Sequence, residues 1–160
     1  MNKTFTLNSI GTVQSNNEQF SLKIDAPFNK ALKELDTFSH VIVFWWADKH
    51  DNENDRKALQ TQLPYAKGTV AGVFACRSEY RPNPIAITVC EISEIDHEAG
   101  VVKIPFIDAF DGTPVLDLKP YIPVTDRLKN FDVPEWFKAW PEWIEDGPEF
   151  FRDFDWGFEE

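Results

Sequence analysis

The sequence predicts a mainly β domain, a barrel or a sandwich of short strands, for three reasons. Short runs of apolar, aromatic and β-branched residues recur at close spacing through most of the chain. These runs do not alternate with helical patterns, as they would in a doubly wound fold. No glycine-rich fingerprint of a dinucleotide site follows any of them. The chain has 160 residues, which is the length of about one domain.

The early strands are predicted from their residue patterns. Residues 4–13 are rich in β-branched side chains, and Gly11 among them favours a bulge or a turn. Residues 20–24 alternate apolar and polar side chains, as a half-buried strand does. Residues 29–35 predict a short helix. The run 40–47 is almost continuously apolar and aromatic, so we expect a buried strand there.

The pattern of short strands continues after a charged interruption. The stretch 48–62 is charged and ends in helix-forming residues, which predicts an exposed loop followed by a short helix. Further strands are expected at residues 68–76, 85–95, 101–110 and 115–118.

We assign residues 1–130 to the β domain and residues 131–160 to an acidic, aromatic extension. A helix is predicted to start at Asp132–Glu135, where a capping acid is followed by a proline and a glutamate. Pro141 is expected to split that helix. Three tryptophans at spacings of four and three share one helical face, which we expect to pack on the barrel or on a dimer interface: Trp136, Trp140 and Trp143.

Composition and charge limit the classes of function. The chain carries 27 acidic and 16 basic residues, a net charge of −11, which argues against nucleic-acid binding without a local basic patch. The two cysteines lie in apolar runs and predict buried free thiols. The sequence shows no signal peptide, no membrane-spanning run and no Cys/His spacing for zinc. We therefore expect a cytoplasmic protein with no metal site and no membrane partner.

The loop Arg77–Pro84 is the most informative stretch. Proline fixes its own φ and restricts the residue before it, so Arg81 and Asn83 are pushed toward extended geometry. A stiff loop with two arginines can preorganise polar groups for a ligand. A plain connection between strands is an equally acceptable interpretation.

A second candidate is the turn signal formed by Asp111, Gly112, Thr113 and Pro114. The backbone amides of such a turn can bind an anion, and the carboxylate can accept hydrogen bonds from an amine or a ribose hydroxyl. A β-turn without a ligand is the simpler interpretation. Elsewhere, the histidines have no triad context, and the acidic residues of 48–55 lack the spacing of a calcium loop.

Taken together, these segments resemble the TsaA-like family, which includes the TrmO tRNA methyltransferases. The similarity begins at Ile10-Gly11, passes through Phe38-Ser39-His40 and ends near Pro123. Its most specific parts are RSxxRPNPI, which begins at Arg77, and DGTPVxDxKPY, which begins at Asp111. The resemblance implies a single-sheeted, partly open β-barrel with short peripheral helices. It also implies a homodimer that binds S-adenosylmethionine near the subunit interface.

The resemblance further implies a reaction and a set of site residues. The reaction is methylation of the exocyclic amine of threonylcarbamoyl-adenosine beside the tRNA anticodon. The residues that carry over to the cofactor site are Asp48, Lys49, Arg77, Arg81, Asp111, Gly112, Thr113 and Pro114, with Asp48-Lys49 in place of a His-Gln pair. The residues assigned to the substrate site are Arg81, Asn83, Lys119 and Tyr121.

Three functions stay open on the sequence: this tRNA methyltransferase, a methyltransferase with a small-molecule or another RNA acceptor, and a non-catalytic S-adenosylmethionine-binding module. Methyl transfer from a sulfonium is an in-line displacement, for which alignment supplies roughly 7–11 kcal/mol. An amine acceptor must also lose a proton. The sequence shows no evident general base, and Asp111 is the best candidate for orienting the amine.

Overall fold

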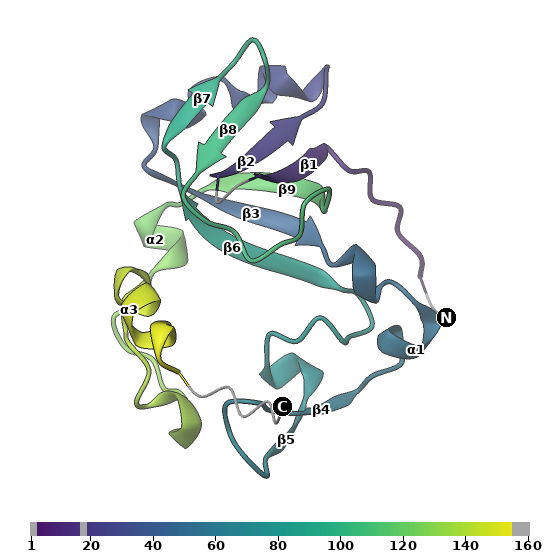
Figure 1. Cartoon of the computed structure of the whole chain (residues 1–160), viewed down its shortest axis with the longest axis vertical. Coiled ribbons are helices and arrows are strands. Elements are labelled where there is room, and N and C mark those ends of the chain that lie inside the picture. The colour runs from purple at the N-terminus through teal and green to yellow at the C-terminus, as the bar shows by residue number, and fades with distance from the viewer. Residues whose placement is uncertain (1–2, 17–18, 155–160) are drawn as a thin grey trace.

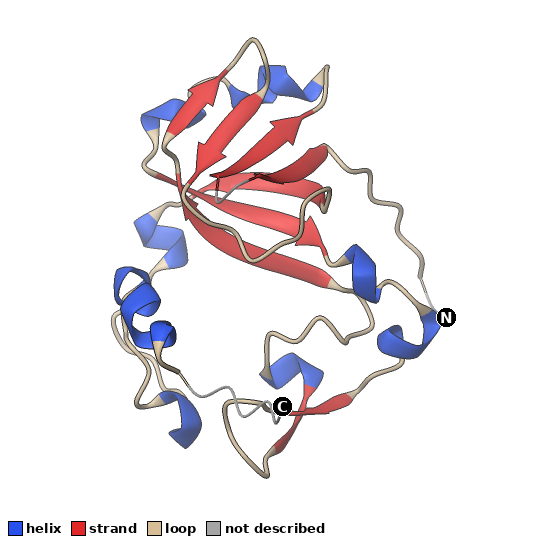
Figure 2. Ribbon diagram, viewed as in Figure 1, coloured by secondary structure: helices blue, strands red, loops and turns tan. Residues whose placement is uncertain are grey.

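A seven-stranded antiparallel sheet forms the body of the protein, in the order β6-β3-β9-β1-β2-β8-β7 (Figures 1 and 2). The computed structural model describes residues 3–16 and 19–154. The strands of this sheet are β1 (Gly11–Asn16), β2 (Gln19–Ile24), β3 (His40–Trp46), β6 (Ile85–Glu91), β7 (Glu94–Asp96), β8 (Val101–Ile104) and β9 (Pro114–Pro120). A separate two-stranded sheet pairs β4 (Gln60–Gln62) with β5 (Val70–Gly72).

The large sheet is not closed into a barrel, so the predicted barrel is right only in its mainly β character and its openness. β6 and β7 lie at opposite ends of the strand order, although only Ile92 and Ser93 separate them in sequence. At this corner the Ile92 amide donates to the Ser39 carbonyl (2.8 Å) and the Ser93 amide donates to the Lys103 carbonyl (2.9 Å). β7 has three residues and pairs with β8 only, while β6 pairs with β3 only. The outer edge of β6 is therefore free within the part of the chain that is described.

The hydrophobic core packs on alternate residues of the central strands. The fully buried members include Val13, Leu22, Val41, Val43, Val102 and Val115. β3 was expected to be buried throughout, but only every second residue of its first half is buried, and its tryptophans are half-buried. This alternation is what an antiparallel sheet with one face on the core produces.

Two short 3₁₀ helices replace the helix predicted over 29–35. They are η1 (Phe28–Leu32) and η2 (Leu35–Thr37). The chain cannot continue as one α-helix because Glu34 has a φ of 67°, in the left-handed region. Leu32 and Leu35 belong to the hydrophobic core all the same.

The stretch 48–62 contains a short helix, but in its middle rather than at its end, where the structure has a strand. η3 (Asp48–His50) is followed by α1 (Glu53–Arg56), and β4 comes after them. The strand expected over 68–76 is short, because η4 (Val73–Ala75) follows β5 directly. The strand expected over 4–13 begins only at Gly11.

After α2 (Pro123–Asp126), the C-terminal extension contains three short helices within its described part: η5 (Glu135–Phe137), η6 (Ile144–Asp146) and α3 (Gly147–Arg152). Helical structure starts near the predicted place, but it is a three-residue 3₁₀ helix that begins at Glu135 with Pro134 in the cap position, so the predicted cap by Asp132 was wrong. The prediction that the three tryptophans share one helical face was wrong, because no continuous helix joins residues 136 to 143. None of the helices in 3–16 or 19–154 has the length and apolar character needed to cross a membrane.

The aromatic side chains of the extension pack with Tyr65, in the connection between β4 and β5. The ring centroid of Tyr65 lies 5.2 Å from that of Phe137 and 5.3 Å from that of Trp140. Trp143 lies apart, 47 % exposed, with the Arg127 guanidinium 4.4 Å from its ring centroid. We name as the aromatic cluster the residues Tyr65, Phe137, Trp140, Phe150, Phe151 and Phe154.

Cys90 on β6 is expected to be almost inert toward thiol reagents in the folded protein. It is 3 % exposed, and burial raises the pKa of its thiol to about 12. Only about one Cys90 in ten thousand would then be a thiolate at pH 8, and the thiolate is the reactive form. Iodoacetamide labelling followed by peptide mass spectrometry should find Cys90 modified only after unfolding in urea. Fast labelling of the native protein would contradict this burial.

Candidate functional site

A cavity of about 880 Å³ lies beside β6. Three parts of the chain line it: the end of β3 with η3, the segment from Phe74 to the start of β6, and the connection between β8 and β9. Figure 1 shows that this last connection passes in front of β3 and β6. The volume is within the range of small-molecule sites. The cavity is therefore large enough for a small-molecule ligand and is lined by segments far apart in the sequence.

The Arg77–Pro84 loop forms one wall of the cavity. Arg81 is half-buried, and its Nη1 donates to the Ser78 carbonyl at 3.3 Å within the same loop. Pro84 is buried, and its carbonyl accepts a hydrogen bond of 2.8 Å from the Ala47 amide at the end of β3. The loop is thus anchored at its C-terminal end, while Arg77 and Arg81 face a common space.

The Asp111–Pro114 turn contributes to the same cavity through one residue, Thr113. The turn is present as predicted: the Thr113 amide donates to the Phe110 carbonyl (3.1 Å), and Gly112 has a φ of 80°. Its other polar groups bind β1. The Gly112 amide donates to the Val13 carbonyl (2.8 Å), and Oδ1 of Asp111 accepts from the Ser15 amide (2.9 Å). These contacts favour a structural role for Asp111.

The cavity brings together some of the site residues predicted from the sequence and leaves others outside. Those that line it are Asp48, Lys49, Arg77, Arg81, Asn83 and Thr113. Those that do not line it are Asp111, Gly112, Pro114, Lys119 and Tyr121. The Lys119 ammonium pairs with Asp117 at 2.8 Å, and the Tyr121 ring packs against His40 with centroids 6.4 Å apart.

Sequence reasoning missed a histidine–aspartate pair at the cavity wall. Nδ1 of His50 lies 2.9 Å from Oδ2 of Asp55, and the His50 ring lies 4.6 Å from the Tyr80 ring. The hydrogen bonds from Asn52 and from His50 lower the pKa of Asp55, so this carboxyl stays ionised. An ionised Asp55 accepts a hydrogen bond from Nδ1–H of His50, which leaves Nε2 as the ring nitrogen without a hydrogen. Nε2 lies 3.7 Å from a Glu79 carboxylate oxygen.

One sequence signal could have indicated this pair. Asn52 begins α1, and its side chain accepts from the backbone amides of Asn54 and Asp55. An asparagine cap followed by an acid three residues later predicts a helix start there. That start places Asp55 one turn into the helix, beside the histidine that precedes the cap.

The apolar part of the lining was also missed, because its residues match the pattern of core strands. Phe74 and Phe110 are 83 % and 67 % exposed, so their rings are open to a planar ligand. Trp45 lies in the wall, where its Nε1 donates to Oγ1 of Thr88 at 3.1 Å. Further apolar lining comes from Ile85, Ala86, Ile87, Ile107 and Ala109.

The charges around the cavity are balanced, although the whole chain has a net charge of −11. Three basic side chains in the lining, Lys49, Arg77 and Arg81, face three acidic ones, Asp48, Glu79 and Asp108. No group of three or more His, Cys, Asp and Glu side chains that could hold a metal ion occurs in 3–16 or 19–154. A cavity with both signs of charge and exposed aromatic rings suits a zwitterionic ligand with a planar base.

Comparison with known proteins identifies the family. Residues 10–127 match the model of the tRNA-methyltransferase O N-terminal domain. The chain belongs to this family. The tRNA-methyltransferase O match extends over the whole large sheet and over every wall of the cavity.

Two relatives and one solved structure illustrate the similarity. A "Probable S-adenosyl-L-methionine-binding protein" of Archaeoglobus fulgidus is 39% identical over 121 residues, which are 76% of this chain and 31% of the relative. The "tRNA (adenine(37)-N6)-methyltransferase" of Escherichia coli is 34% identical over 125 residues, 75% of this chain and 52% of the enzyme. A crystal structure of TrmO from P. aeruginosa superposes with a TM-score of 0.65 at 26% identity, over 84% of this chain and 62% of that one.

Proposed function

We propose that this chain binds S-adenosylmethionine in the cavity beside β6 and methylates the exocyclic amine of threonylcarbamoyl-adenosine in cytoplasmic tRNA. The observation that carries the proposal is the shared cavity: the arginine loop and Thr113 of the glycine turn line one space of suitable volume and balanced charge. The family and the names of the relatives support the same chemistry.

The donor set of the cavity fits the ligand. The guanidinium groups of Arg77 and Arg81 suit the carboxylate of the methionine part, since arginine binds carboxylates through two parallel hydrogen bonds. The carboxylates of Asp48 and Asp108 suit its ammonium group. Phe74 or Phe110 would stack on the adenine. S-adenosylmethionine, when bound, supplies a methyl group whose bond to sulfur breaks as the bond to the acceptor nitrogen forms.

The residues of this chain would then align the acceptor and remove its proton. The amine nitrogen loses one proton for each methyl group gained, and we assign that proton to Nε2 of His50. Asp55 holds the imidazole through Nδ1, which fixes the direction of the accepting nitrogen. Asp111, the candidate from the sequence, is bound to the Ser15 amide and lies outside the cavity.

A second candidate acceptor, a small molecule or another RNA, is favoured by the placement of the basic residues. Lys119 is paired with Asp117, and Arg127 lies over Trp143, so neither extends the basic side of the cavity. A homodimer, implied by the resemblance, is part of this proposal. Light scattering on the purified protein would measure this.

The proposal is tested in two steps. Calorimetric titration with S-adenosylmethionine and with S-adenosylhomocysteine should show one site per chain; absence of heat with both ligands would remove the cofactor from the proposal. Incubation with unmethylated tRNA and mass spectrometry of its nucleosides should show methylated threonylcarbamoyl-adenosine. Cofactor binding without this product would contradict the proposed acceptor and leave the second acceptor or a non-catalytic binding module.

Arg81→Lys is expected to weaken S-adenosylmethionine binding about tenfold, or ~1.4 kcal/mol, because an ammonium cannot copy the planar fork of a guanidinium. Calorimetry measures the change. Lys103→Arg, at the far edge of the sheet beside Glu94, is the matched control and should bind like wild type. Unchanged affinity in Arg81→Lys would assign Arg81 to holding the loop through Ser78.

A further inference from the structure

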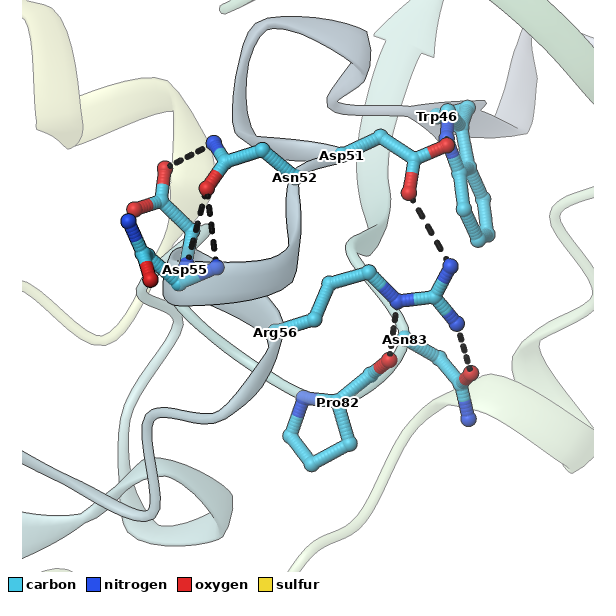
Figure 3. Close-up of polar contacts among 8 residues, drawn as sticks. Trp46, Asp51, Asn52, Asp55, Arg56, Pro82 and Asn83 are labelled. Carbon is cyan, nitrogen blue, oxygen red and sulfur yellow. Dashed lines mark hydrogen bonds and ion pairs between the residues drawn. The ribbon is translucent and has the colours of Figure 1, made fainter.

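Arg56 on α1 does not line the cavity, yet its guanidinium binds the loop that does. Its Nε donates to the Pro82 carbonyl at 2.9 Å, and its Nη2 donates to Oδ1 of Asn83 at 3.4 Å (Figure 3). Its Nη1 donates to Oδ1 of Asp51 at 3.0 Å. Three separate nitrogens of one side chain therefore join the Pro-Asn turn to the segment before α1.

Asp51 connects this group to β3. Its second carboxylate oxygen, Oδ2, accepts a hydrogen bond of 3.0 Å from Nε1 of Trp46, the last residue of β3. The Arg56 guanidinium also lies 5.9 Å from the centroid of the Trp46 ring. The guanidinium is thus held between the end of a sheet strand and a loop 26 residues further along the chain (Figure 3).

The residue before Arg56 on the same helix contacts another part of the cavity wall, the segment that carries His50. Asn52 caps α1 and donates from Nδ2 to Asp55 at 2.8 Å, and Asp55 contacts His50. Arg56, the next residue, contacts Pro82 and Asn83. One short helix therefore spans the two walls that carry the proposed proton acceptor and the proposed cofactor arginines.

We propose that Arg56 is a positioning residue: by fixing Pro82 and Asn83 against Asp51 and Trp46, it sets the place of Arg81 and the width of the cavity. This inference rests on the proposed function. Only a guanidinium has donors in the fork geometry that reaches all three acceptors; a lysine ammonium would keep the ion pair with Asp51 and lose the loop. The ion pair is half-exposed, so its contribution to global stability is small.

The first test compares ligand affinity in Arg56→Met, Arg56→Lys and Lys57→Met. We expect both Arg56 variants to bind S-adenosylmethionine about tenfold more weakly, with nearly unchanged melting temperatures. In methylation assays the KM for S-adenosylmethionine should rise with little change in kcat. Lys57→Met is the matched control, because Lys57 is the next residue and pairs only with Glu53 at 2.5 Å among the ion pairs of the described chain. Wild-type affinity in Arg56→Lys would contradict the claim that a guanidinium is needed to reach all three acceptors. Wild-type affinity in Arg56→Met would overturn the proposal.

The second test needs no ligand, and so separates this inference from the proposed function. Hydrogen exchange of the peptide covering residues 77–88 in the ligand-free protein should be about fivefold faster in Arg56→Met than in wild type or Lys57→Met. Faster exchange in a protein that does not bind S-adenosylmethionine would support the positioning role and overturn only the proposed function. Equal exchange in all three proteins would overturn the positioning role.

Discussion

Replacing Gly11 with alanine is expected to destabilise the protein by about 3 kcal/mol. The added methyl group has no space between the packed strands, so the backbone would have to shift to accommodate it. Gly11 opens β1, between Ile24 of β2 and Val115 of β9. A Cβ atom there would lie 2.1 Å from the Lys23 carbonyl oxygen and 2.9 Å from the Ile24 Cα. Both atoms belong to the backbone of the neighbouring strand, so no side-chain rotation relieves the clash. Urea denaturation of the purified variant measures the loss.

Gly72→Ala provides the matched control for this prediction. Gly72 also lies in a strand, but its Cβ would be 3.8 Å from the Leu59 carbonyl oxygen, an ordinary contact. Its φ of −64° suits alanine, so we expect a change within about 0.5 kcal/mol of wild type. If Gly11→Ala and Gly72→Ala had the same stability, the close approach of β1 to β2 would be wrong.

The strands that the sequence predicted are those whose local pattern matches their final environment. Residues 20–24 alternate and form the half-buried β2. The apolar run 40–47 also predicted a strand, β3, but not its one-sided burial. β4 was missed because Gln60–Gln62 is polar and pairs only with β5, away from the core. Whether the sheet closes could not be predicted, because closure depends on contacts between edges rather than on the pattern within any strand.

The parts of the site that could be predicted are those whose backbone conformation is restricted by nearby prolines or by a turn-forming Asp-Gly pair. The prolines around Asn83 mark the loop that lines the cavity, and the Asp-Gly pair marks the turn that places Thr113 there. Sequence could not show that the carboxylate of Asp111 turns toward β1, because its partner Ser15 is 96 residues away. It also could not show that Arg56 contacts Pro82, because that contact joins α1 to a loop 26 residues further along the chain.

The His50–Asp55 pair should be disrupted at a lower pH than the one at which a free aspartate titrates. Hydrogen bonds from Asn52 and His50 lower the pKa of Asp55 in the folded protein. A carboxyl with a lowered pKa contributes its stabilisation above its unfolded-state pKa, near 3.9, and loses it as the pH falls through the lower folded value. A titration of the Asp55 carboxyl by NMR should give a midpoint below that of a free aspartate. A midpoint at or above the free value would contradict the contacts with Asn52 and His50.

His50→Gln is expected to lower the rate of methyl transfer by about 10²–10⁴-fold, the range of general acid–base catalysis, while leaving S-adenosylmethionine affinity unchanged. The amide of glutamine fills similar space but cannot take up the amine proton. Asp55→Asn should lower the rate less, because the imidazole keeps its basic nitrogen and loses only its orientation. The matched control is His97→Gln: His97 also faces a carboxylate, Asp36 at 3.4 Å, but does not line the cavity. Single-turnover rates with bound S-adenosylmethionine separate chemistry from binding. If His50→Gln and His97→Gln had equal rates, His50 would not be the proton acceptor. Solvent would then take the proton, and the main contribution of this cavity to catalysis would be alignment by the two arginines.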